Sequence, residues 1–78
     1  MEKSEILKLI GKRIKELRIQ KGISQADLVG RMEGNIDPTN ISRIEAGRTN
    51  PTVITLYRIA EALEIKLIDL LNIEASEN

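Results

Sequence analysis

The chain has 78 residues, the size of one domain, with 41% hydrophobic and 31% charged residues. It contains no His and no Cys, which removes imidazole acid–base catalysis, thiol nucleophiles, the usual zinc ligands and disulfides. Its apolar runs are far shorter than the roughly 20 residues of a membrane helix, and no signal-peptide core follows the first residues. We therefore expect one cytoplasmic, non-enzymatic domain over 1–78 with no cofactor.

The formal net charge is zero, but the charges are unevenly distributed. Residues 1–31 carry eight basic and four acidic side chains, a balance of +4, whereas residues 59–78 carry one basic and five acidic side chains, a balance of −4. A dipolar molecule of this kind can turn a basic face toward phosphate and its other end toward a partner or solvent. Charge alone does not establish nucleic-acid binding.

Apolar residues recur at helical spacing from Ile6 to Leu17, which predicts a first helix. Ser4 is the expected N-cap of this helix. Gly22 is expected to end it, because glycine adopts the left-handed conformation of a C-terminal cap at little cost.

Ser24 is expected to begin a second helix, with Asp27 at the position of a capping box. Its core residues are Leu28 and Met32. Gly30 costs about 1 kcal/mol relative to Ala inside a helix, so we expect another backbone to approach it.

A third helix is predicted from Asp37, a suitable N-cap, and Pro38, which fits the first helical position. Ile41 and Ile44 should point inward, and Gly47 should end the helix. The second and third helices form a helix-turn-helix over about residues 24–47.

Thr52 is expected to cap a fourth helix, with Tyr57 packed against the rest of the chain. The residues expected to face inward on this helix are Val53, Leu56, Ile59, Ala60 and Leu63. A short fifth helix follows over 67–71, and 74–78 should fray. No apolar pattern has the period of two typical of strands, so the predicted fold is all-α, a compact five-helix bundle.

The third helix carries polar side chains where a DNA-reading helix needs them: Thr39, Asn40 and Arg43. In the major groove Arg can bond guanine at two atoms, Asn can bond adenine, and a Thr methyl can touch that of thymine. Asn40 could instead bond a phosphate. The alternative is that all three are ordinary surface residues.

Phosphate contacts are expected on both sides of this helix. Ser24 and Gln25 stand at the start of the second helix, where free backbone donors favour an anion. Arg48 and Asn50 follow the third helix. Two such clamps would fix the register of the reading helix on the duplex.

Five short stretches occur in a recognisable order: KELR at 15–18, GISQADL at 22–28, ISRIEAGR at 41–48, NPT at 50–52 and LYRIAEAL at 56–63. With them the chain resembles the Xre/Cro group of phage and bacterial repressors over about residues 5–72. The resemblance implies a five-helix domain of the phage-repressor DNA-binding type, dimeric operator binding and transcriptional control. It also implies that Gln25 contacts phosphate and that Thr39, Asn40 and Arg43 face bases.

The resemblance further suggests an ion pair between Arg18 and Glu45. A partly buried pair with two hydrogen bonds would hold the third helix at a fixed angle. The alternative is that both residues are ordinary exposed charges.

The chain departs from the family pattern in three places. The link between the second and third helices is about two residues longer than usual, which could shift the base contacts by one position. Glu64 stands where the family usually has Gly, and Lys66 replaces a small capping residue.

Two classes of function remain open. The first is a dimeric repressor that binds an approximately palindromic operator on double-stranded DNA. The second is an antitoxin or adaptor that binds a protein through its acidic, apolar C-terminal end. The candidate residues for the homodimer interface are Leu67, Leu70, Leu71 and Ile73. Leu67 and Leu70 could instead close the core. Single-stranded RNA is disfavoured because Tyr57 is the only aromatic residue available for base stacking.

Overall fold

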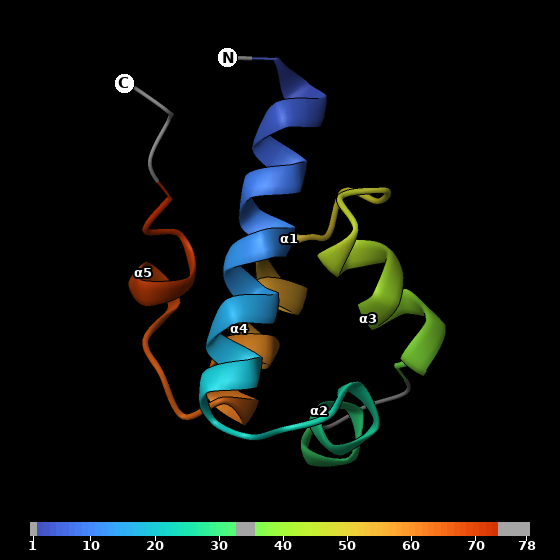
Figure 1. The fold of residues 1–78 in the computed structure, drawn as a ribbon, viewed down its shortest axis with the longest axis vertical. Coiled ribbons are helices and arrows are strands. Elements are labelled where there is room, and N and C mark those ends of the chain that lie inside the picture. The colour runs from blue at the N-terminus through green and yellow to red at the C-terminus, as the bar shows by residue number, and fades with distance from the viewer. Residues whose placement is uncertain (1, 33–35, 74–78) are drawn as a thin grey trace.

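The computed structural model describes residues 2–32 and 36–73. These residues form five α-helices and no strand (Figure 1). The helices are α1 Lys3–Gln20, α2 Gln25–Arg31, α3 Pro38–Glu45, α4 Val53–Ala62 and α5 Leu67–Leu70. The all-α, five-helix prediction is confirmed. The expected fraying of 74–78 lies outside the described residues.

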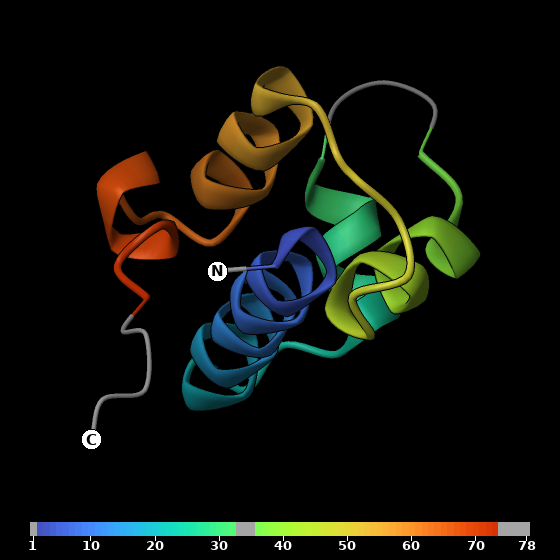
Figure 2. The same ribbon diagram turned by 90° about the horizontal axis from the view of Figure 1, so that it is seen from above.

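The long helix α1 runs through the middle of the molecule. α3 and α5 lie on opposite sides of it, and α4 lies behind it (Figure 1). The view from above shows the same order, with α1 between α3 and α5 (Figure 2). Every helix contributes to one core, whose largest fully buried side chains are Ile14, Leu28, Ile41, Ile44, Ile59, Leu63 and Leu70.

Three of the predicted helix starts are confirmed by hydrogen bonds. The Ser24 hydroxyl accepts from the Asp27 amide at 3.0 Å, and the Asp27 carboxylate accepts from the Ser24 amide at 3.3 Å, which completes a capping box. Asp37 caps α3 through the Thr39 amide, with Pro38 at the first helical position. Thr52 caps α4.

The predicted start of the first helix is wrong. α1 begins before Ser4, at Lys3, with Glu2 at the N-cap position and no side-chain cap. The Glu2 carbonyl already accepts from the Ile6 amide at 3.1 Å, so Ser4 lies inside the first turn.

Glycine plays two different roles here. Gly22 and Gly47 adopt positive φ angles of 68° and 74° and end their helices, as predicted. The prediction for Gly30 is wrong, because a Cβ there would meet nothing within 4 Å. The close approach occurs at Gly11 instead, where a Cβ would lie 2.3 Å from the Ile44 carbonyl oxygen. Gly11 therefore lets α1 cross α3 at short range.

The connection between α4 and α5 is built without the family's usual glycine. Glu64 takes a left-handed φ of 59°, the conformation that glycine would adopt at lower cost. The Asp69 carboxylate accepts from the Lys66 amide at 3.0 Å, which supplies the start of α5 with a partner. Arg13 on α1 donates from Nε to the Asp69 carbonyl at 2.9 Å, and so ties α5 to α1.

Two inward placements on α4 are corrected. Val53 is 67% exposed and Tyr57 is 51% exposed. The core-facing side of α4 is formed by Leu56, Ile59 and Ala60. Val53 is the first residue of α4 and lies at the edge of that side, and Tyr57 lies about 100° from Leu56 around the helix, toward solvent.

Candidate nucleic-acid interface

The outer face of α3 is polar and exposed. Ile41, Ile44 and Glu45 bury one side of the helix, and the opposite side presents Thr39, Ser42 and Arg43. Thr39 and Arg43 are four residues apart, so their side chains are neighbours on that face. The sequence reasoning missed Ser42, although its spacing of three residues from Thr39 places it on the same stripe.

Asn40 lies at the edge of this face. Its side chain is half-buried, whereas Thr39 and Arg43 are exposed. Helical geometry explains the difference, because Asn40 stands 100° from Thr39, toward the buried side. This position suits a contact with a groove wall or phosphate as well as with a base edge.

A buried ion pair joins α1 to α3 on the side of α3 opposite its polar face. Arg18 Nε donates to Glu45 Oε2 at 2.6 Å, and Arg18 Nη2 donates to Glu45 Oε1 at 3.0 Å. The two side chains are only 10% and 4% exposed. The predicted pair is therefore formed, with the two-bonded geometry expected of guanidinium and carboxylate.

The third nitrogen of Arg18 is also occupied. Nη1 donates to the carbonyl of Ile23 at 2.8 Å, in the segment that links α1 to α2. The hydrogen bond to Glu45 raises the pKa of Arg18 above its ordinary value, burial opposes this shift, and the charge of Glu45 adds to it. Arg18 is thus a fixed cation that positions α1, the α1–α2 link and α3.

Gln25 joins the same network from α2. Its Nε2 donates to Glu45 Oε1 at 3.0 Å, and the residue is half-buried. Ser24, which precedes it, is exposed. The sequence did not reveal the bond between Gln25 and Glu45, because 20 residues separate the two along the chain.

The other candidate phosphate contacts lie beyond the end of α3. Arg48 and Asn50 are both exposed. The Arg48 amide donates to the Arg43 carbonyl at 2.9 Å, so the loop that carries Arg48 is anchored to α3. The candidate clamps therefore stand on elements that are each bonded to α3.

The C-terminal candidates for the dimer interface separate into two groups. Leu70 is 0% exposed and belongs to the core, so its assignment to an interface is wrong. It is buried because α5 closes the bundle over α1 and α4. Leu67 and Ile73 are half-buried, and Leu71 is 42% exposed.

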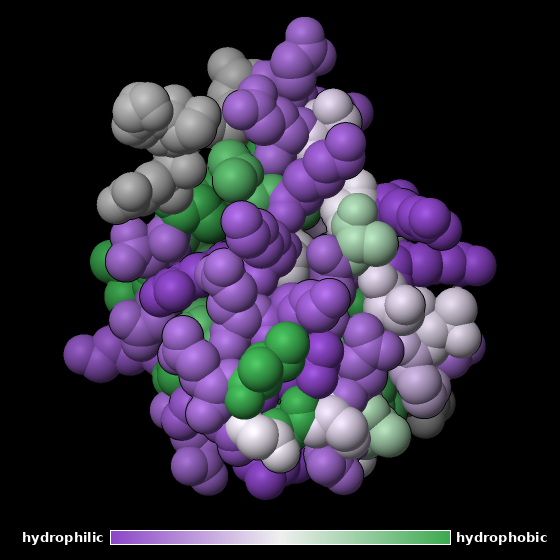
Figure 3. Space-filling view, in the orientation of Figure 1, coloured by the Kyte–Doolittle hydropathy of each residue, from purple (hydrophilic) through white to green (hydrophobic). Residues whose placement is uncertain are grey.

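Exposed apolar side chains that the sequence reasoning did not assign to an interface lie on α1, α4 and α5. They are Ile6, Ile19, Val53, Ile54, Tyr57 and Ile68. α4 and α5 pack against each other, and apolar surface is visible over α5 at the left of Figure 3, where the face over α1 is mostly hydrophilic. The apolar surface of the described residues is thus not confined to the C-terminal segment.

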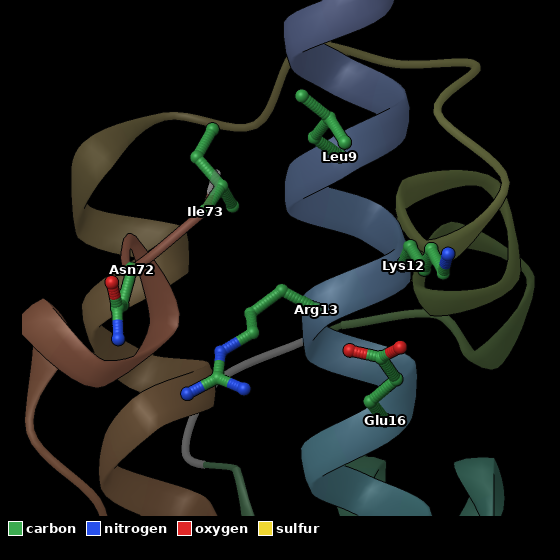
Figure 4. A pocket seen from close by; sticks show the side chains of 6 residues that line it. All are labelled: Leu9, Lys12, Arg13, Glu16, Asn72 and Ile73. Carbon is green, nitrogen blue, oxygen red and sulfur yellow. The ribbon is translucent and has the colours of Figure 1, made fainter. Parts of the chain in front are cut away.

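A hollow of about 310 Å³ lies between α1 and the residues that follow α5. Leu9, Lys12, Arg13 and Glu16 line it from α1, and Asn72 and Ile73 line it from the other side (Figure 4). It lies on the α5 side of α1, away from the polar face of α3 (Figures 1 and 4).

Within 2–32 and 36–73, no helix is long and apolar enough to cross a membrane. The same residues hold no group of three or more His, Cys, Asp or Glu side chains arranged to bind a metal ion.

Comparison with known proteins places this arrangement in a family. The family model described as Helix-turn-helix matches residues 14–70. The chain is 38% identical over 66 residues to a protein of Sinorhizobium fredii (strain NBRC 101917 / NGR234) named Uncharacterized HTH-type transcriptional regulator y4dJ. The match covers 85% of this chain and 83% of that protein.

Solved structures share the fold over most of its length. The restriction-modification controller protein C.AhdI from Aeromonas hydrophila superimposes with a TM-score of 0.76 at 30% identity, over 85% of this chain and 96% of that one. The controller protein C.Esp1396I, solved as a tetramer in complex with its natural 35 base-pair operator, gives 0.71 at 33% identity, over 85% and 93%. The chain belongs to the helix-turn-helix family of Xre/Cro-type transcriptional regulators.

Proposed function

We propose that this chain is a dimeric transcriptional repressor that binds a specific site on double-stranded DNA, with α3 in the major groove. The observation that carries the proposal is that α3 has an exposed polar face on one side and a buried ion pair on the other. Its outer face presents Thr39, Ser42 and Arg43, while a buried ion pair at its other side fixes the helix to α1. A reading helix needs both exposed polar side chains and a rigid mount.

Within this proposal, Arg43 and Thr39 contact base edges, and Asn40 contacts a base or the groove wall. Arg43 suits guanine because its planar guanidinium can donate twice to O6 and N7. Ser24, Gln25, Arg48 and Asn50 contact phosphates on either side. Phosphate contacts would set the register, and the contacts of α3 would supply the discrimination between sequences.

A homodimer explains the exposed apolar side chains of α4 and α5. A domain of this size buries only about 60% of its unfolded surface and gains stability from a partner. The solved controller protein that is bound to its operator is a tetramer, so oligomers of a similar fold do assemble on DNA. For this chain we propose a two-fold dimer through Ile54, Tyr57, Ile68 and Leu71, on an approximately palindromic operator.

The proposed role in transcription also bears on the domain organisation, the location and the cofactors of the chain. The described helices surround one core, which supports a single domain over 1–78. A regulator of this kind works where the DNA is, in the cytoplasm of a bacterium, and needs neither a cofactor nor a catalytic site.

A protein-binding role is the second candidate. The same exposed side chains of α4 and α5 could bind a different protein, as an antitoxin or adaptor does. Two results would favour this protein-binding role: an interface with a heterologous partner that is larger than the homodimer interface, and no preference of the chain among DNA sequences.

Selection of bound sites from a random pool of duplex DNA tests the proposal. We expect enrichment of one sequence with two-fold symmetry. R43A and N40A should then stay folded and lose about 1–3 kcal/mol of preference for the selected site over random duplex at each lost base contact. Unchanged preference in both variants would remove α3 from the reading role.

A further inference from the structure

Three helices meet at one carboxylate. Glu45 Oε1 accepts from Arg18 Nη2 on α1 and from Gln25 Nε2 on α2, both at 3.0 Å, while Oε2 accepts from Arg18 Nε. The Arg18–Glu45 pair joins α3 to α1. The bond to Gln25 is an additional contact, made by a side chain that the proposed function places on a phosphate.

A carboxylate oxygen can only accept hydrogen bonds, and this fixes the amide of Gln25. The amide has an acceptor end and a donor end, and only the donor end, Nε2, can face Glu45. The NH₂ group has two hydrogens, and Glu45 uses one of them. A phosphate oxygen also only accepts, so the second hydrogen is the kind of group that a phosphate needs.

We infer that Glu45 is a positioning residue for DNA binding: through its bond to Gln25 it holds the amide with an N–H available to the phosphate backbone. This inference rests on the proposed function, in which Gln25 contacts phosphate. Glu45 itself is buried on the inner side of α3 and touches no base. Its effect on DNA passes through Gln25, in addition to its bracing of α3.

The bond also links the two kinds of contact that a repressor makes. Glu45 belongs to the helix that carries Arg43, and Gln25 belongs to the preceding helix. A shift of α3 relative to α2 would break the 3.0 Å bond between Gln25 and Glu45. The phosphate clamp and the reading helix are therefore held in one register before DNA arrives, which lowers the ordering cost of binding.

Relaxation of side-chain amides by NMR tests the positioning step in the free protein. The chain has two glutamines, Gln25 and Gln20, and Gln20 is exposed at the end of α1, so it serves as the matched control. We expect the order parameter of the Gln25 amide to approach the value of about 0.85 of rigid backbone, and that of Gln20 to fall below about 0.6. Equal mobility of the two amides overturns the inference.

The variant E45Q tests the effect on DNA. The new amide can present either end to Gln25, so Gln25 loses its fixed orientation. We expect the affinity for selected and random duplex to fall together by about tenfold, and the mobility of the Gln25 amide to rise toward that of Gln20. Removal of a negative charge would by itself strengthen binding to phosphate, so a uniform fall cannot come from charge alone.

The double variant Q25A/E45Q separates the effect of Glu45 on the Gln25 amide from its effect on the position of α3. Where Gln25 is already Ala, E45Q should cost no further affinity once the folded fraction is taken into account. An equal loss in both backgrounds overturns the inference, because Glu45 would then act through α3 alone. If E45Q does not fold, the mobility of Gln25 in the unmodified chain still decides the question.

The same measurements distinguish a failure of this inference from a failure of the proposed function. Failure of the unmodified chain to bind any duplex DNA refutes the proposed function. A mobile Gln25 amide in a chain that does bind DNA refutes only the role of Glu45.

Discussion

All three nitrogens of the Arg18 guanidinium are in use: two donate to Glu45 and the third donates to the Ile23 carbonyl. A cation taken out of water in this way is stable only while each partner remains, because a lost partner leaves a buried charged donor unpaired. The hydrogen bond to Glu45 raises the pKa of Arg18, so the guanidinium stays charged at neutral pH. The role of Arg18 is therefore structural: its side chain holds α1, the α1–α2 link and α3 together.

Removal of one partner of this pair should destabilise the domain strongly. We expect R18M or E45L alone to lower the free energy of unfolding by about 3–5 kcal/mol, because each leaves a buried charge without its partner. The double variant R18M/E45L should recover part of the loss. Recovery stays incomplete because the buried Ile23 carbonyl still lacks its partner, and a buried unpaired group costs about 1–3 kcal/mol.

Urea unfolding of the four proteins in this cycle measures the coupling between the two residues. A coupling energy near zero would mean that the two side chains do not interact in solution.

At the residue scale, the sequence predicted the interactions that depend only on residues close in the chain. The caps at Ser24, Asp37 and Thr52 are formed as expected, because a cap needs only the few residues that follow it. The bond between Gln25 and Glu45 could not be predicted in this way, because it depends on the packing of α2 against α3.

At the scale of the helices, the crossing of α1 and α3 determines where the polar face of α3 points. Gly11 lies at this crossing, where the backbone carbonyls of Ile44 and Glu45 would be 2.3 and 2.6 Å from an added Cβ. Neither carbonyl can move independently of α3, since both belong to its last turn. Glycine is thus required at this crossing for steric reasons, in a helix whose φ angles any residue could adopt.

Gly11 and Gly30 form a matched pair for a test. Both are helical glycines, but a Cβ at Gly30 meets nothing within 4 Å. We expect G11A to destabilise the domain by about 1–3 kcal/mol through overpacking. We expect G30A to stabilise it by about 0.5–1 kcal/mol through the helix propensity of alanine. Thermal unfolding of the two variants should move in opposite directions, and equal shifts would contradict the close crossing of α1 and α3.

The sequence singled out Gly30 and passed over Gly11, and the reason is physical. Both glycines cost helix stability, and a local pattern cannot tell which of them faces a neighbouring backbone. The positions of Val53 and Tyr57 depend in the same way on how α4 is rotated against the core. Helix periodicity identified α4 and most of its buried residues, but the ends of its apolar face were set by packing.

At the scale of the whole molecule, α3 and α5 lie on opposite sides of α1 (Figures 1 and 2). The polar face of α3 and the apolar surface formed by Ile68 and Leu71 at α5 are therefore separate. A partner that binds at α5 need not cover α3. The chain order of helices, the helix-turn-helix and its polar face could be predicted from the sequence, because they follow from periodicity and capping. The extent of the apolar surface could not, since Leu70 turned inward and Ile54 and Tyr57 turned outward.

Charged substitutions on α4 and α5 test the proposed dimer. L71E and I54E should each lower the dimer content and the operator affinity together, because a carboxylate buried in an apolar interface is strongly disfavoured. I19E is the matched control, since Ile19 is 57% exposed but lies at the end of α1. We expect I19E to keep the dimer content of the unmodified chain.

Analytical ultracentrifugation with and without operator DNA gives the stoichiometry for this test. A two-fold dimer should place two copies of α3 about 34 Å apart, one turn of the duplex, so each operator should bind two chains. The affinity should then fall when the two half-sites are moved apart by half a turn, because the two helices would no longer reach the same side of the DNA. One chain on a single asymmetric site would refute the dimer, and the exposed side chains of α4 and α5 would then be a surface for another protein.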